Sequence, residues 1–237
     1  MTYKSGAVNN EYLLAFLRDA LSRFTEFGRD IVIGSVNASN GVYVEFDQKN
    51  ILFSEVPDAA VASASIPLVF PPHIWEGSQL SGTFMDGGTV YNINPEGAVR
   101  QCLDGIVDDE SKIIMDIYIC GASEAPDQID ESGNGWENYF RGRSIGKWYG
   151  STNSVSYFTK AHPDVQLRHV VLQTEGHMGG LSELNFEGSF TQAAQDQGKL
   201  DAQNALNGTT NFANIFTEWN GDQNLRNRYE QVGDYIK

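Results

Sequence analysis

Apolar residues recur at helical spacing near the start of the chain. Between Glu11 and Phe24, leucines and the final phenylalanine fall at positions that share one side of a helix. Asn10 precedes this stretch and is a suitable N-cap residue. The pattern therefore predicts an amphipathic helix over residues 11–24.

Two short segments rich in β-branched and aromatic residues come next. They run from Asp30 to Val36 and from Val42 to Phe46, and Asn40-Gly41 stands between them. Because Asn-Gly tolerates the positive φ angles of tight hairpin turns, we predict a β-hairpin here. The Asn-Ile-Leu-Phe stretch at residues 50–53 is predicted to add a short strand.

The pattern beyond residue 56 indicates alternating helices and strands. Pro57 suits a helix start, and the helix over residues 58–65 must end before Pro67. Further helices are predicted over residues 95–103 and 190–206, and further strands over residues 79–86, 113–120 and 165–172.

Two later stretches carry distinct signals. Ile113 to Cys120 is almost continuously apolar, which is typical of a strand buried on both faces of a parallel sheet. Residues 121–159 are rich in Gly, Ser, Asn and aromatic residues without a clear period, so we predict a long loop or an irregular helical insertion. Its aromatic residues are expected to pack this segment rather than to line a lipid-facing rim.

Length and charge narrow the function classes. The chain has 237 residues, of which 41% are hydrophobic, enough for one sizeable core. It has no apolar run of the roughly 18 residues that a membrane-spanning helix needs, and its first ten residues lack a signal-peptide layout. We expect a soluble cytoplasmic protein whose membrane contact is peripheral. A net charge of −15 without a Lys/Arg cluster argues against nucleic-acid binding.

The sequence offers no pattern typical of a metal or cofactor site. Cys102 and Cys120 form no C-x-x-C pair and are interpreted as buried thiols. The four histidines have no metal-ligand spacing. Residues 130–135 begin like a calcium loop, but Arg141 stands where its glutamate belongs. We therefore expect neither a metal nor an organic cofactor.

The segment from Ala62 to Pro95 carries the candidate chemistry. It contains A-S-A-S-I-P-L-V-F-P-P at residues 62–72, F-M-D-G-G at residues 84–88, and N-I-N-P at residues 92–95. Asp86 is predicted to end a strand, where Gly87 and Gly88 permit positive φ and leave no side chain to block a cleft. Alternatively, Asp86 merely caps a turn by accepting backbone N–H bonds.

These linked elements resemble the patatin-like phospholipases, a family of lipid acyl hydrolases. The resemblance covers roughly residues 1–205 and implies an α/β, three-layer fold with a mainly parallel sheet. It implies a partial domain over residues 1–207 and a C-terminal tail over residues 208–237. It also implies that Asp86, followed by the motif residues Gly87 and Gly88, is the general base of a Ser-Asp dyad. The implied substrate is a phospholipid or another acyl ester, reached through transient membrane-surface contact.

The family's serine is not identified in this chain. The resemblance places a glycine-rich oxyanion loop and a G-x-S-x-G nucleophile elbow before this region, and neither precedes it, so we expect the N-terminal strands to be missing. Ser144 lies in a literal G-x-S-x-G, but it follows Asp86 and no apolar strand precedes it. Ser63 and Ser65 are interpreted as packing residues. The alternatives are a non-catalytic lipid- or protein-binding descendant, or an unrelated α/β binding domain.

Overall fold

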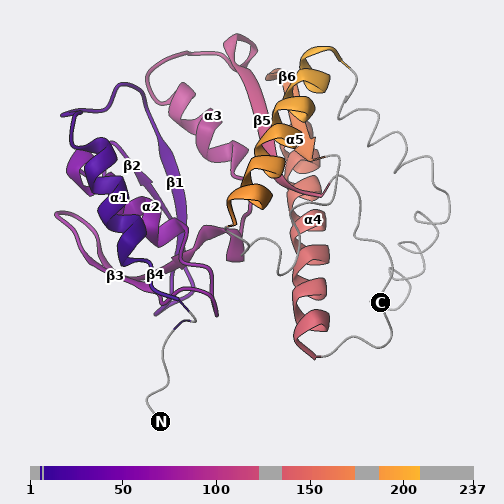
Figure 1. Cartoon of the computed structure of the whole chain (residues 1–237). Coiled ribbons are helices and arrows are strands. Elements are labelled where there is room, and N and C mark those ends of the chain that lie inside the picture. The colour runs from indigo at the N-terminus through magenta and orange to yellow at the C-terminus, as the bar shows by residue number, and fades with distance from the viewer. Residues whose placement is uncertain (1–5, 7, 123–134, 174–186, 209–237) are drawn as a thin grey trace, which may run out of the picture. The chain divides into compact units, whose positions relative to one another are not determined.

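The computed structural model describes residues 6, 8–122, 135–173 and 187–208 (Figure 1). The chain divides into two compact units. The first comprises Met1–Ile113 with Tyr149–Val165, and the second comprises Ile114–Trp148 with Gln166–Lys237.

The first unit contains an antiparallel four-stranded sheet. Its strand order is β2-β1-β4-β3, and its members are β1 (Val32–Asn37), β2 (Tyr43–Asp47), β3 (His73–Glu76) and β4 (Ser81–Asp86). The predicted hairpin is confirmed, because β1 pairs with β2 and Gly41 has a φ of 73° in the turn. The pattern did not predict β3, which pairs with β4.

The predicted strand at residues 50–53 is wrong, because side chains turn the backbone there. The Asn50 side chain accepts a hydrogen bond from the Asp47 amide at 3.0 Å. Glu55 likewise accepts one from the Leu52 amide at 2.7 Å and thereby starts the short 3₁₀ helix η1 (Phe53–Glu55). Local side-chain bonds of this kind compete with strand pairing.

Two helices cover one face of the sheet. Helix α2 (Val56–Ser63) packs on the sheet, and α1 (Glu11–Leu21) packs on α2 (Figure 1). Ala59 and Ala62 of α2 are fully buried against an aromatic cluster of Phe46, Trp75 and Phe84. The three rings meet edge to face with centroids 4.9 to 6.0 Å apart. The small alanine side chains let the helix approach these rings closely.

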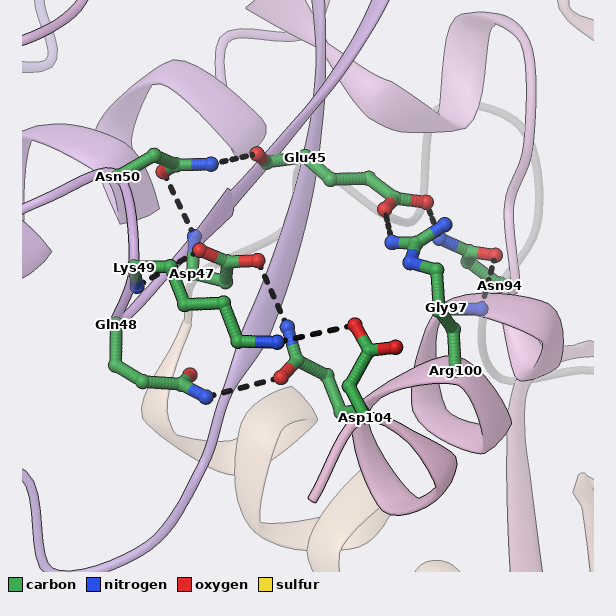
Figure 2. A network of polar contacts seen from close by, with 10 residues as sticks. Glu45, Asp47, Gln48, Lys49, Asn50, Asn94, Gly97, Arg100 and Asp104 are labelled. Atoms are coloured by element: carbon green, nitrogen blue, oxygen red, sulfur yellow. Dashed lines mark hydrogen bonds and ion pairs between the residues drawn. The ribbon is translucent and has the colours of Figure 1, made fainter.

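Two acidic residues of β2, Glu45 and Asp47, make polar contacts with helix α3 (Pro95–Leu103). Glu45 pairs with Arg100, and the Gln101 amide donates to the Asp47 carboxylate at 2.7 Å in a buried contact (Figure 2). Because neighbouring residues of a strand point to opposite faces of the sheet, Phe46 packs in the aromatic cluster whereas Glu45 and Asp47 contact α3. The polar network therefore fixes α3 against β2.

The second unit contains a parallel strand pair. Strand β5 (Ile114–Ala122) pairs with β6 (Gln166–Gln173), and α5 (Gly188–Leu206) packs on β6. Met115, Ile117 and Ile119 are buried, whereas Ile114 and Tyr118, on the opposite face of the strand, are exposed. The prediction that this strand is buried on both faces is therefore wrong.

Three further expectations need correction. The fold is mixed α/β, but a mainly parallel sheet is not confirmed, because the four-stranded sheet is antiparallel and parallel pairing joins β5 to β6. Residues 135–161 form a regular helix, α4 (Gly135–Ala161), rather than a loop or irregular insertion. Cys120 is exposed and Cys102 half-buried, so neither is a buried thiol.

Helix α4 was missed because its apolar residues follow no single stripe. Val155 and Phe158 are buried, whereas Tyr139 and Tyr157 are exposed, so only part of the aromatic segment packs as expected. The calcium-like stretch over residues 130–134 and the tail beyond residue 208 lie outside the described residues. None of the helices in the described ranges has the length and apolar character that crossing a bilayer requires.

Leu68 occupies a backbone conformation that suits glycine. Its φ is 78°, at the third position of a turn closed by a 3.1 Å hydrogen bond from the Val69 amide to the Ile66 carbonyl. A type II turn requires positive φ at this position. We expect Leu68→Gly to be more stable than Leu68→Ala by about 1 kcal/mol, since both remove the side chain and only alanine keeps the strain. Urea unfolding measures the difference; equal stability of the two variants would contradict it.

His162 follows the C-terminal end of α4 and contacts two elements of the first unit. Its ring nitrogens lie 2.7 Å from Glu110 of the 3₁₀ helix η3 (Glu110–Lys112) and 2.7 Å from Glu96 of α3. Burial opposes the charged imidazole, but the hydrogen bonds to Glu110 and Glu96 outweigh it and raise the pKa of His162. A protonated ring donates to both carboxylates.

This contact makes stability depend on pH. A raised folded-state pKa gives stabilisation that is complete below the unfolded value of about 6.5 and lost as the pH rises through the folded value. We expect His162→Gln to lose more unfolding free energy, relative to the parent, at about pH 5.5 than at about pH 9. Urea unfolding at both pH values checks this; a larger loss at the higher pH would refute it.

Candidate functional site

Asp86 ends β4 and begins a tight turn. It pairs with Ser35 of β1, and its amide donates to the Ser65 carbonyl at 3.0 Å. Its carboxylate accepts a hydrogen bond from the Gly88 amide at 2.8 Å and so caps the 3₁₀ helix η2 (Gly87–Thr89). The capping bond that we considered as an alternative is therefore present.

The two motif glycines are required for space rather than for positive φ. The glycines with positive φ in the described residues are Gly41, Gly105 and Gly208, so the predicted conformational reason is wrong. A Cβ on Gly87 would lie 2.4 Å from the Gly34 carbonyl oxygen, because the turn presses against β1. A Cβ on Gly88 would lie 3.2 Å from Asp86 Oδ1 and would crowd the carboxylate.

Asp86 lines a cavity of about 270 Å³ in the first unit. The cavity is lined by β1 and β2 and by the C-terminal ends of β4 and α2. Its walls combine small, hydroxyl and amide residues with one carboxylate: Val32, Gly34, Tyr43, Ser63, Asp86, Gly87, Gly88, Tyr91, Asn92 and Asn94. The motif thus opens onto a polar recess rather than into the apolar core.

Tyrosine rings form one wall of this recess. Tyr43 lies across Gly34, where an added Cβ would come within 1.9 Å of its hydroxyl. The Tyr43 and Tyr91 rings meet edge to face at 5.0 Å. Burial is the main cause that raises the pKa of Tyr43, the nearby Tyr91 adds to it, and a hydrogen bond with Asn94 opposes it. The Tyr43 hydroxyl therefore stays protonated and can donate a hydrogen bond.

Two asparagines form another wall, and contacts outside the cavity hold both. Asn92 donates to the buried Ser151 hydroxyl at 2.8 Å. Asn94 accepts from the Gly97 amide at 3.0 Å as the N-cap of α3 and donates to Glu45 at 2.6 Å (Figure 2). The Asn-Pro helix start expected from the sequence is confirmed, and the same residue also borders the cavity.

The three serines considered from the sequence have different places. Ser63 ends α2 and lines the cavity with Asp86. Ser65 is buried and donates to the Val61 carbonyl at 2.8 Å. Ser144 lies within the long helix α4, where no strand-to-helix turn exists. The sequence did not predict that Tyr43 and Ser63 line the cavity. The position of Ser63 in the motif segment at residues 62–72 was a signal that could have indicated it.

A comparison with protein-family models gives a match over the N-terminal part of the chain. Residues 5–99 match the family model of the patatin-like phospholipases. This segment contains Asp86 to Gly88 and Asn92 to Pro95, so the resemblance inferred from those motifs is confirmed there. A search of curated proteins found no match.

The close approach at Gly87 predicts unequal effects of two alanine substitutions. Gly87→Ala forces a Cβ against the backbone of Gly34 and is expected to cost about 1–3 kcal/mol of unfolding free energy. Gly88→Ala meets the more movable Asp86 and Asn92 side chains and should cost less. Urea unfolding of both variants tests this; a larger loss for Gly88→Ala would show that the contact with β1 is not the constraint.

Proposed function

We propose that this chain, whose residues 5–99 match the patatin-like phospholipase family, carries the general base of a lipid acyl hydrolase. In this proposal Asp86 is the base, its partner is a serine outside these 237 residues, and the substrate is a phospholipid or another acyl ester. The supporting observation is that Asp86 lines a cavity together with Gly88, which has no side chain to cover the carboxylate.

In the proposed reaction, Asp86 acts as a general base and must lie within hydrogen-bond distance of the serine hydroxyl. The carboxylate accepts the proton of the serine hydroxyl while the serine oxygen attacks the ester carbonyl. Asp86 then gives this proton to the leaving alcohol, and the serine keeps the acyl group. Water attacks the acyl-enzyme and gives a proton to Asp86, which passes it to the serine oxygen as the fatty acid leaves. The hydrogen bond from the Gly88 amide holds the carboxylate in one orientation through this cycle.

Exposed aromatic residues on α1 support contact with a membrane surface. Tyr12 is 86% exposed and Phe16 is 65% exposed, one helical turn apart. Aromatic side chains of this kind favour the interface between water and lipid. Such contact does not depend on charge, in agreement with a chain that carries a net charge of −15.

Fatty-acid release from mixed phospholipid vesicles tests the proposal. The assay compares the 237-residue chain with the same chain extended by the coding sequence that precedes Met1. We expect release by the extended form alone, and a loss of about 10²-fold or more in its Asp86→Asn variant, as for removal of a general base. Ser144→Ala in the extended form is the matched control and should keep full activity.

Three outcomes would contradict the proposal. The first is an extended form whose activity survives Asp86→Asn. The second is an extension without a G-x-S-x-G serine, together with inactivity of both forms, which would favour a binding protein. The third is activity of the 237-residue chain that Ser63→Ala abolishes, because Ser63 shares the cavity and would then be the nucleophile.

A further inference from the structure

The side chain of Tyr43 reaches across β1 at the position of Gly34. Tyr43 pairs with Val36, so its ring runs two residues along the neighbouring strand. An added Cβ on Gly34 would lie 1.9 Å from the Tyr43 hydroxyl oxygen and 2.7 Å from its Cζ. The phenol end of Tyr43 therefore occupies the space that a side chain at position 34 would need.

The same glycine adjoins the Asp86 turn. The Gly34 carbonyl oxygen lies 2.4 Å from the position of an added Cβ on Gly87, and the next residue of β1, Ser35, pairs with Asp86. Gly34, Tyr43 and Asp86 all line the cavity of about 270 Å³. This volume lies below the range of about 300–1,000 Å³ that is usual for sites of drug-sized ligands. A group that fills the cavity therefore lies close to both the phenol and the carboxylate.

The Tyr43 hydroxyl is set up as a hydrogen-bond donor. Burial is the main cause that raises the pKa of Tyr43, so the hydroxyl stays protonated at neutral pH. The hydrogen bond with Asn94 lowers this pKa, so the phenol oxygen accepts it and the Tyr43 proton is not used in it. Asn94 is held in turn, because it caps α3 and donates to Glu45 at 2.6 Å (Figure 2).

We propose that the Tyr43 hydroxyl donates a hydrogen bond to the carbonyl oxygen of an ester group bound in the cavity, and that Gly34 leaves the space this requires. The inference rests on the proposed function, because the ester is its substrate. The carbonyl oxygen is the better acceptor of the two ester oxygens. A donor placed there also stabilises the negative charge that develops on this oxygen when a nucleophile attacks.

Two short-chain phospholipids test this contact without any hydrolysis. Dihexanoyl phosphatidylcholine and its diether analogue have the same head group, and only the diester has carbonyl oxygens. Both are titrated into the 237-residue chain below the concentrations at which they form micelles, and the Gly88 amide signal in the NMR spectrum reports binding in the cavity. We expect the diester to bind at least threefold more tightly, as one additional hydrogen bond allows.

Two variants should abolish this preference. Tyr43→Phe keeps the ring and removes the donor. Gly34→Ala keeps the donor but displaces the phenol, because the added Cβ meets the movable end of the Tyr43 side chain. The double variant should show no further loss, since both changes remove the same hydrogen bond.

Matched controls carry the same substitutions elsewhere. Tyr118→Phe removes a hydroxyl from an exposed position of β5 in the second unit. Gly28→Ala adds a Cβ that would meet no atom within 4 Å. Both controls should keep the preference for the diester. Urea unfolding of Tyr43→Phe checks that the variant remains folded under the titration conditions, and this variant decides the test if Gly34→Ala does not fold.

The inference is overturned if the parent chain binds both lipids equally, if folded Tyr43→Phe keeps the preference, or if a control variant loses it. In the extended chain, Tyr43→Phe should lower kcat about tenfold or more. A preference that depends on Tyr43, without ester hydrolysis by the extended chain, would keep this donor and contradict the enzyme. Hydrolysis that depends on Asp86 but has the same kcat in Tyr43→Phe would contradict this inference and leave the proposed function standing.

Discussion

The contact between the Asp86 turn and β1 is the constraint on which the site depends. Gly87 lies so close to Gly34 that a single added carbon would come within 2.4 Å of the carbonyl oxygen. This approach is possible because residue 87 has no side chain, and the pairing of Ser35 with Asp86 holds the two backbones in register. The position of the carboxylate is therefore set by backbone packing, which is more rigid than a side-chain contact alone.

The two faces of the four-stranded sheet make different kinds of contact, one apolar and one polar. On one face, the aromatic cluster and the alanines of α2 exclude water and supply the hydrophobic free energy of the first unit. On the other, Glu45 and Asp47 hold α3 through charged and amide contacts (Figure 2). Asn94 belongs to this network and also borders the cavity, so a stabilising contact and a candidate binding contact share one residue.

The sequence alone determined the features that depend on residues a few positions apart. Asn40-Gly41 predicted the hairpin, Asn94-Pro95 the start of α3, and the segment around Asp86 the family match. Local side-chain bonds and turn preferences carry this information, so it is visible in short stretches. The helix predicted over residues 190–206 is also confirmed, as α5.

Only the tertiary structure decided which distant residues meet. The antiparallel pairing of β1 with β4, the exposed face of β5, and the meeting of Tyr43 and Ser63 with Asp86 involve residues far apart in the chain. Helix α4 escaped prediction because its apolar residues follow no single stripe. The need for Gly87 shows the difference most clearly: the motif marked the position, but the physical reason is the Gly34 backbone, more than fifty residues earlier.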